Sequence, residues 1–184
     1  MDVTDRQYPY NNYAILPDIS RKIIDHLLKD ERANVLWKLL NGQTNEDWNS
    51  PDITIDEKRN LIYTGYGDST QYSVFMDMGM EDGVYQKKAF LRIAPVGIYP
   101  TNRTVGVIDI GFEIFVDSKA NHLSNYKTRM NMILQNLLEC LNGTDIGGLG
   151  VVFFNHEMRS SNKMYNIGQV PYKGSFLVAS INVG

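Results

Sequence analysis

Histidines and carboxylates are the side chains of this chain that could bind a metal ion or catalyse hydrolysis. The three histidines, His26, His122 and His156, lie far apart in the sequence. His156-Glu157 lacks the second histidine that a zinc-protease helix carries three residues after its glutamate. The sequence therefore predicts no metal site.

Two further segments resemble ligand-binding loops only in composition. Asp77, Glu81 and Asp82 miss the spacing of a calcium loop, and the neighbouring glycines are typical of a turn. The glycine-rich segment 143–150 follows a helical pattern and precedes a strand, the reverse of the order that presents helix amides to a phosphate. We interpret both segments as turns.

No nucleophile stands in a recognisable catalytic motif. Cys140 is the only cysteine, so the chain has no internal disulfide. Its place among helical apolar residues is typical of a small buried hydrophobic side chain rather than a reactive thiol. A Gly-x-Ser-x-Gly elbow and a Walker loop are both missing. The sequence thus predicts no catalytic residue and no cofactor.

Two alternatives remain open at this point. The first is a small hydrolase or transferase whose site is built from distant residues, with His156 and Glu157 near Asp109 or Glu113. The second is a soluble adaptor that binds a single host protein.

Length, charge and hydropathy exclude several classes of protein. The chain has 184 residues, which fits one domain, and its longest apolar runs fall far short of the ~20 residues that cross a bilayer. A formal charge of −3 without a basic cluster argues against a surface that binds nucleic acid. The amino end lacks the pattern of a signal peptide, so we expect a protein made in a cytosol, without a membrane partner.

The most regular pattern lies between residues 104 and 150. Even-numbered positions from Ile108 to Val116 are apolar and most of the odd ones are not, which predicts a strand with one buried face. Asp117 and Ser118 are typical helix caps, and apolar residues then recur three and four apart from Leu123 through Tyr126 onwards to residue 141. We expect this long helix to pack across the even face of the strand.

Other elements are placed around this core. Residues 15–62 predict a helical region, with two helices before Gly42 and a capping box at Thr54-Ile55-Asp56-Glu57. Strands are expected at 72–76 and 85–94, joined by a hairpin turn, with a break between Pro95 and Pro100. Further strands are expected at 151–154 and 174–183.

These elements predict an α+β fold, a mainly antiparallel sheet with a long helix on one face. An extended arm, residues 1–14, precedes a single domain, residues 15–184. The arm lacks any helical or strand period.

Three segments carry more aromatic and apolar residues than solvation requires, and such surfaces favour partners. They are the arm, the loop 76–80 and the stretch 156–171, which is part of a long connection between strands. The interface residues predicted in them are Tyr8, Tyr10, Tyr13, Met78, Met80, Met158, Met164 and Tyr165.

Several stretches resemble the small ring proteins of tailed-bacteriophage necks and tails, which include head-to-tail connectors and tail terminators. The stretches are 23–28 with 35–40, then 51–58, then 111–116 with the following helix to Cys140, and finally the closing strand at 172–178. The abundance of Asn, Tyr and Met is also similar to ring proteins of crAss-like podoviruses.

The resemblance implies a non-enzymatic subunit of a ring of six or twelve copies. Such a ring docks on portal, connector or tail proteins in the virion, or caps the tail tube, and DNA passes through its lumen without sequence-specific binding. A mildly acidic chain suits such a conduit, because a lumen that attracted phosphates would impede ejection.

Overall fold

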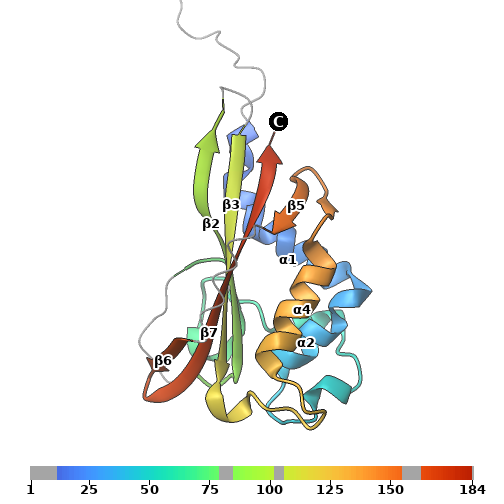
Figure 1. Ribbon diagram of the computed structural model, residues 1–184, viewed down its shortest axis with the longest axis vertical. Coiled ribbons are helices and arrows are strands. Elements are labelled where there is room, and N and C mark those ends of the chain that lie inside the picture. Colours follow the sequence, from blue (N-terminus) through green and yellow to red (C-terminus); the bar gives the residue numbers. More distant parts are fainter. Residues whose placement is uncertain (1–11, 79–84, 102–105, 155–162, 184) are drawn as a thin grey trace, which may run out of the picture.

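The structure is a computed structural model that describes residues 12–78, 85–101, 106–154 and 163–183. It confirms the α+β fold: a seven-stranded sheet carries α1, α2 and α4 on one face (Figure 1). The helices are α1 (Ile19–Lys29), α2 (Asn34–Asn41), α3 (Ile55–Arg59) and α4 (Arg129–Leu141). The strands are β1 (Val74–Phe75), β2 (Ala89–Pro100), β3 (Gly106–Asp117), β4 (Asp145–Ile146), β5 (Gly150–Phe154), β6 (Lys163–Ile167) and β7 (Val170–Val183).

The sheet is centred on β3. Its strand order is β1-β2-β3-β7-β5-β4, with β6 beside the first half of β7, and every pair except β1 with β2 is antiparallel. Phe112 on β3 stands opposite Ile93 on β2 and Leu177 on β7. The even face of β3 is buried from Ile108 to Val116, as the alternation predicted.

The helical layer covers this even face. Leu137 and Cys140 of α4 are fully buried in the same cluster as the β3 side chains. Asn136 of α4 accepts a hydrogen bond from the Leu36 amide at 3.1 Å, which satisfies a free amide near the start of α2. Trp37 of α2 donates its indole N–H to the Leu27 carbonyl of α1 at 2.9 Å. The capping box before α3 is present as predicted.

The long helix begins later than predicted. Asp117 does cap a helical turn, but that turn is a 3₁₀ helix of three residues, Ser118–Ala120. Residues 121–128 then form a loop, and α4 begins at Arg129 with Thr128 as its cap. Leu123 is buried, whereas Tyr126, which we expected on the apolar stripe, is fully exposed. The end of the helix at Asn142, followed by Gly143 with a φ of 74°, is confirmed.

The predicted hairpin before β2 is wrong. β1 pairs with Leu91 and Arg92 of β2 in parallel, so a tight turn cannot join the two strands. The predicted break between Pro95 and Pro100 is also wrong, because β2 continues through both prolines with a bulge after Pro95. Beyond Arg92, β2 is an edge strand among the described residues, where a missing backbone N–H is tolerated on the open side.

Part of the long connection after β5 is described. Residues 163–173 form a hairpin of β6 with the start of β7, turning at Gly168 and Gln169, both with positive φ. Its earlier part, residues 155–162, lies outside the described residues, as do residues 1–11 of the predicted arm. Asn12–Asp18 form a 3₁₀ helix in which Ile15 and Leu16 pack against the core.

Candidate interaction surface

Two of the four polar residues considered for a distant catalytic site are described. Asp109 accepts a hydrogen bond from the Ser180 hydroxyl at 2.5 Å on the neighbouring strand. Glu113 stands opposite Arg92, and burial raises the pKa of its carboxyl while Arg92 acts against that rise. His156 and Glu157 lie outside the described residues. Within the described ranges, no group of three or more metal-binding side chains lies together.

Of the eight predicted interface residues, three have described side chains. Met78 lies over Gly111 with Phe176, so close that a Cβ at this glycine would overlap both side chains. Met164 on β6 is half-exposed, and its sulfur accepts a hydrogen bond from Ser118 at 3.7 Å. Tyr165 packs edge-to-face on Phe115 at 5.2 Å. Tyr165 therefore contributes to packing within its own domain.

The side chains of the other five predicted interface residues lie outside the described part of the structure. Tyr13 belongs to the 3₁₀ helix that precedes α1. The others, Tyr8, Tyr10, Met80 and Met158, lie outside the described residues.

The outer face of the sheet, opposite the helices, is covered at its lower end by aromatic side chains. Phe75, Tyr85, Phe90, Phe115 and Tyr172 form a second buried cluster there. Alternation of apolar and polar residues would predict a solvated odd face. Instead, aromatic side chains cover part of that face.

Arg92 is buried beside this cluster. Its guanidinium lies 5.0 Å from the centre of the Phe75 ring and its Nη1 lies 3.6 Å from the Asp77 carboxylate. Among the described residues, its Nε and Nη1 have no hydrogen-bond partner. Arg92 therefore places a positive charge in the interior of the protein.

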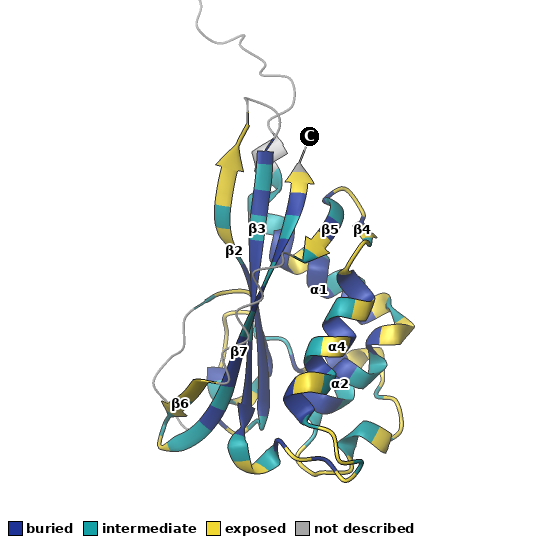
Figure 2. Ribbon diagram, viewed as in Figure 1, coloured by how far each residue is buried: buried dark blue, intermediate teal, exposed yellow. Residues whose placement is uncertain are grey.

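The upper half of β2 projects as an exposed strand (Figure 2). Val96, Ile98 and Tyr99 keep 46%, 46% and 58% of their surface accessible. The Leu91 amide donates to the Ser73 carbonyl, just before β1, at 2.7 Å. Pro95 lies four residues further along β2, so its nitrogen faces the same side, which is the open edge at that point. Proline there removes a donor, which protects the edge from further strand pairing. The apolar side chains, rather than the backbone, are what this strand offers.

The Tyr126 loop, residues 121–128, presents the most exposed large side chain in the described structure. Tyr126 is 102% exposed relative to the reference state, and its φ is 62°. A bulky residue in the left-handed region is an outlier that glycine or asparagine would relieve. Such strain at a surface tip points to a use for the side chain.

The loop is held rigidly from beneath. The Tyr126 amide donates to the Leu123 carbonyl at 3.2 Å, and the Ser124 amide donates to the Asn45 carbonyl at 3.0 Å. The Trp48 indole donates to the Ser124 hydroxyl at 3.0 Å. Arg129, fully buried just after the loop, donates to the Leu39 carbonyl at 2.7 Å, and its other bonds run to neighbouring backbone and carboxylate oxygens.

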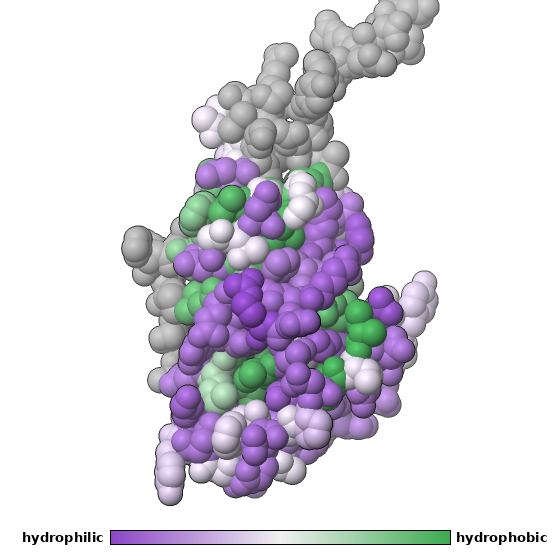
Figure 3. Space-filling view, turned by 90° about the vertical axis from the view of Figure 1, so that its right-hand side faces the viewer, coloured by the Kyte–Doolittle hydropathy of each residue, from purple (hydrophilic) through white to green (hydrophobic). Residues whose placement is uncertain are grey.

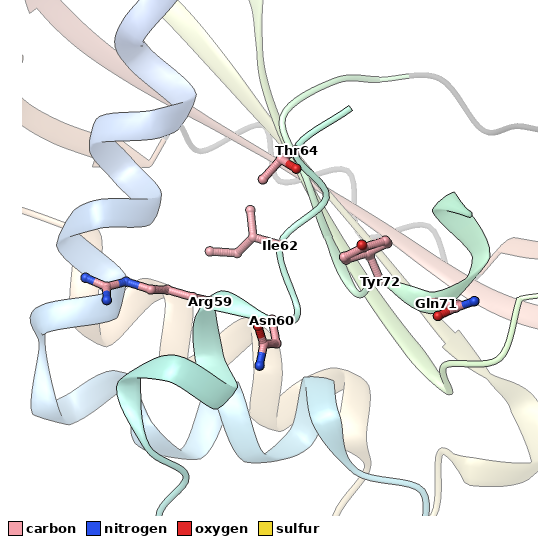
Figure 4. A pocket seen from close by; sticks show the side chains of 6 residues that line it. All are labelled: Arg59, Asn60, Ile62, Thr64, Gln71 and Tyr72. Carbon is pink, nitrogen blue, oxygen red and sulfur yellow. The ribbon is translucent and has the colours of Figure 1, made fainter. Parts of the chain in front are cut away.

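A hollow of about 400 Å³ opens between the end of α3 and the segment before β1 (Figure 4). We call it the Tyr72 hollow. Its lining combines two apolar side chains with four polar ones: Arg59, Asn60, Ile62, Thr64, Gln71 and Tyr72. Tyr72 is held in place by the Tyr63 ring at 5.4 Å.

Sequence patterns had indicated neither the Tyr126 loop nor the hollow. The available signal was Ser124-Asn125, a typical turn pair within a predicted helix. The hollow unites residues from two segments and carries no local signal.

The helical side of the molecule is mainly hydrophilic, with separate apolar spots (Figure 3). Among the described residues, none of the helices has the length and hydropathy that membrane crossing requires.

These features define a small α+β domain with exposed, well-supported side chains at distinct points of its surface. Residues 33–173 match the model of the YomW family, and the chain belongs to this family. The family is phage-type, so the chain is a phage-associated protein. No curated protein matches the chain.

Proposed function

We propose that the chain is a non-enzymatic structural subunit of the virion, which forms a ring in the neck or tail. The ring joins the portal to the tail or terminates the tail tube, and DNA passes through its lumen. The phage-type family supports the particle context of this proposal. Resemblance to neck and tail ring proteins supplies the finer role.

The projecting half of β2 carries the proposal. Val96, Ile98 and Tyr99 expose apolar surface on a strand that hydrogen bonds to β3 hold in place, and exposed apolar groups on a rigid element are typical of protein interfaces. The prolines of β2 protect its edge from uncontrolled strand pairing. A subunit that must assemble in one defined geometry needs both properties.

Localisation in the particle tests this role. Purified virions are labelled with an antibody against the chain and imaged by negative stain. The proposal expects label at the neck or tail and the chain among the virion proteins by mass spectrometry. A chain found only in the lysate, and never in particles, would overturn it.

A further inference from the structure

Tyr126 and the Tyr72 hollow match each other in size and chemistry. Pockets of about 300 Å³ and above accept small ligands, so a hollow of about 400 Å³ has room for one tyrosine side chain. Ile62 and Tyr72 offer apolar contact to an incoming ring. Asn60 and Thr64 add polar atoms to the lining. Tyrosine is the side chain that combines a large apolar ring with a polar tip.

The Tyr126 ring does not fill the hollow of its own chain, because it is fully exposed. We propose that Tyr126 of one subunit inserts into the Tyr72 hollow of the next subunit. This inference rests on the proposed ring function and names a contact that builds the ring.

Charge on the two surfaces is complementary. Residues 118–128 contain Lys119 and Lys127, both exposed, and no acidic residue. The segment 55–72 around the hollow contains three exposed acidic residues, one of which, Asp56, is paired with Arg59 at 3.4 Å. The remaining cation, Lys58, is buried against Asn34. The basic loop is therefore attracted to the acidic surround.

The contact is heterologous, since the loop and the hollow are different patches of one surface. Such head-to-tail contacts close into rings when the rotation between neighbours allows it. The anchoring of the loop favours insertion, because little backbone conformational entropy is lost when the side chain docks.

Cross-linking of mixed variants tests the contact directly. Lys127→Cys, which keeps the neighbouring Tyr126 ring, and Thr64→Cys are prepared separately in the full chain, and Cys140 is fully buried and serves as the unreactive background. A short bis-maleimide is added to each variant alone and to an equimolar mixture. The inference expects a dimer band in the mixture and little in either variant alone. Wild-type protein treated alike is the control.

The self-association constant gives an independent readout. Tyr126→Asn removes the ring and relieves the left-handed backbone, so it is expected to weaken association at least about 30-fold, as the loss of an interface hot spot does. Its melting temperature should stay the same or rise by about 2–4 °C. Tyr126→Phe should retain most of the association. His122→Ala, an exposed change in the same loop, should leave it unchanged.

The outcomes separate this contact from the ring itself. If wild-type protein assembles while the mixture fails to cross-link and Tyr126→Asn still associates, the contact is wrong and the ring stands. Equal cross-linking of Lys127→Cys with itself would also overturn the contact, because it indicates a symmetric interface. A wild-type protein that stays monomeric would overturn both.

Discussion

Arg129 and Asp47 form an ion pair inside the protein, with Nη2 2.7 Å from Oδ2 and the arginine side chain fully buried. The same guanidinium donates to the carbonyl of Leu39 in the last turn of α2 and to that of Thr44 beyond it. It therefore satisfies backbone acceptors that the helix terminus leaves free, and fixes the loop before α4 to the loop after α2.

Replacing Arg129 by methionine should destabilise the protein by about 3–5 kcal/mol, since Asp47 and several carbonyls lose their buried partner. Arg21→Met is the matched control. Arg21 pairs with Asp18 and Asp25 at the surface, where such pairs contribute about 0–1 kcal/mol. Urea unfolding at one protein concentration measures both. Equal losses in the two variants would show that the buried network is not needed.

Leu137→Ala should lower the free energy of unfolding by about 2–5 kcal/mol, because the side chain is fully buried between α4 and the sheet and truncation leaves a cavity. Gln135→Ala, on the exposed side of the same helix, should change it by less than about 0.5 kcal/mol. An unchanged thermal midpoint for the leucine variant would mean that the helix does not pack as described.

Cys140 should resist thiol reagents in the folded protein. Burial raises the pKa of its thiol to about 11, so about one thiol in a thousand is ionised at pH 8, and its side chain is inaccessible. A chromogenic disulfide reagent should react slowly with native protein and with one equivalent after denaturation. Rapid reaction in the native state would show that the thiol is reachable.

Asp30 should make stability depend on pH. Its hydrogen bonds from the Arg32 side chain lower the pKa of its carboxyl below the usual value. The stability that this contributes is fully present above the unfolded pKa of about 3.9, and is lost as pH falls through the lower folded value. The difference in unfolding free energy between wild type and Asp30→Asn should therefore shrink from pH 6 to pH 3. A constant difference would exclude this linkage.

Deleting residues 1–11 should leave the melting temperature of the monomer nearly unchanged and prevent assembly. The segment has no helical or strand period, yet Tyr8 and Tyr10 offer interface surface, and an extended segment of this length reaches ~35 Å. Differential scanning fluorimetry and sedimentation velocity measure the two effects. A much lower melting temperature would place the segment in the domain core, and normal assembly would make it a plain tail.

Elements governed by local pattern were predictable from the sequence. The strand around Ile110 alternates between apolar and polar side chains at most positions, and the first two helices have apolar stripes, so burial follows from the period. The start of α4 was not predictable in this way. Asp117 caps a 3₁₀ turn, and Arg129 then draws the chain towards Asp47 through contacts 82 residues apart in sequence.

Tertiary context also decided the other differences. β1 has only two residues, too few for a sequence pattern to indicate that it pairs in parallel with β2. The prolines of β2 are tolerated because that part of the strand is an edge among the described residues. The Tyr126 loop and the Tyr72 hollow depend on contacts between distant segments. Single-sequence patterns cannot encode them.

The oligomeric state of the purified full-length protein tests the ring most directly. Mass photometry across a concentration series, with negative-stain class averages of the same sample, gives the copy number and the shape. We predict closed rings of six or twelve times the 21.0 kDa of one chain. A protein that remains monomeric at every concentration, and also when it is mixed with virions that lack this chain, would contradict the proposed ring.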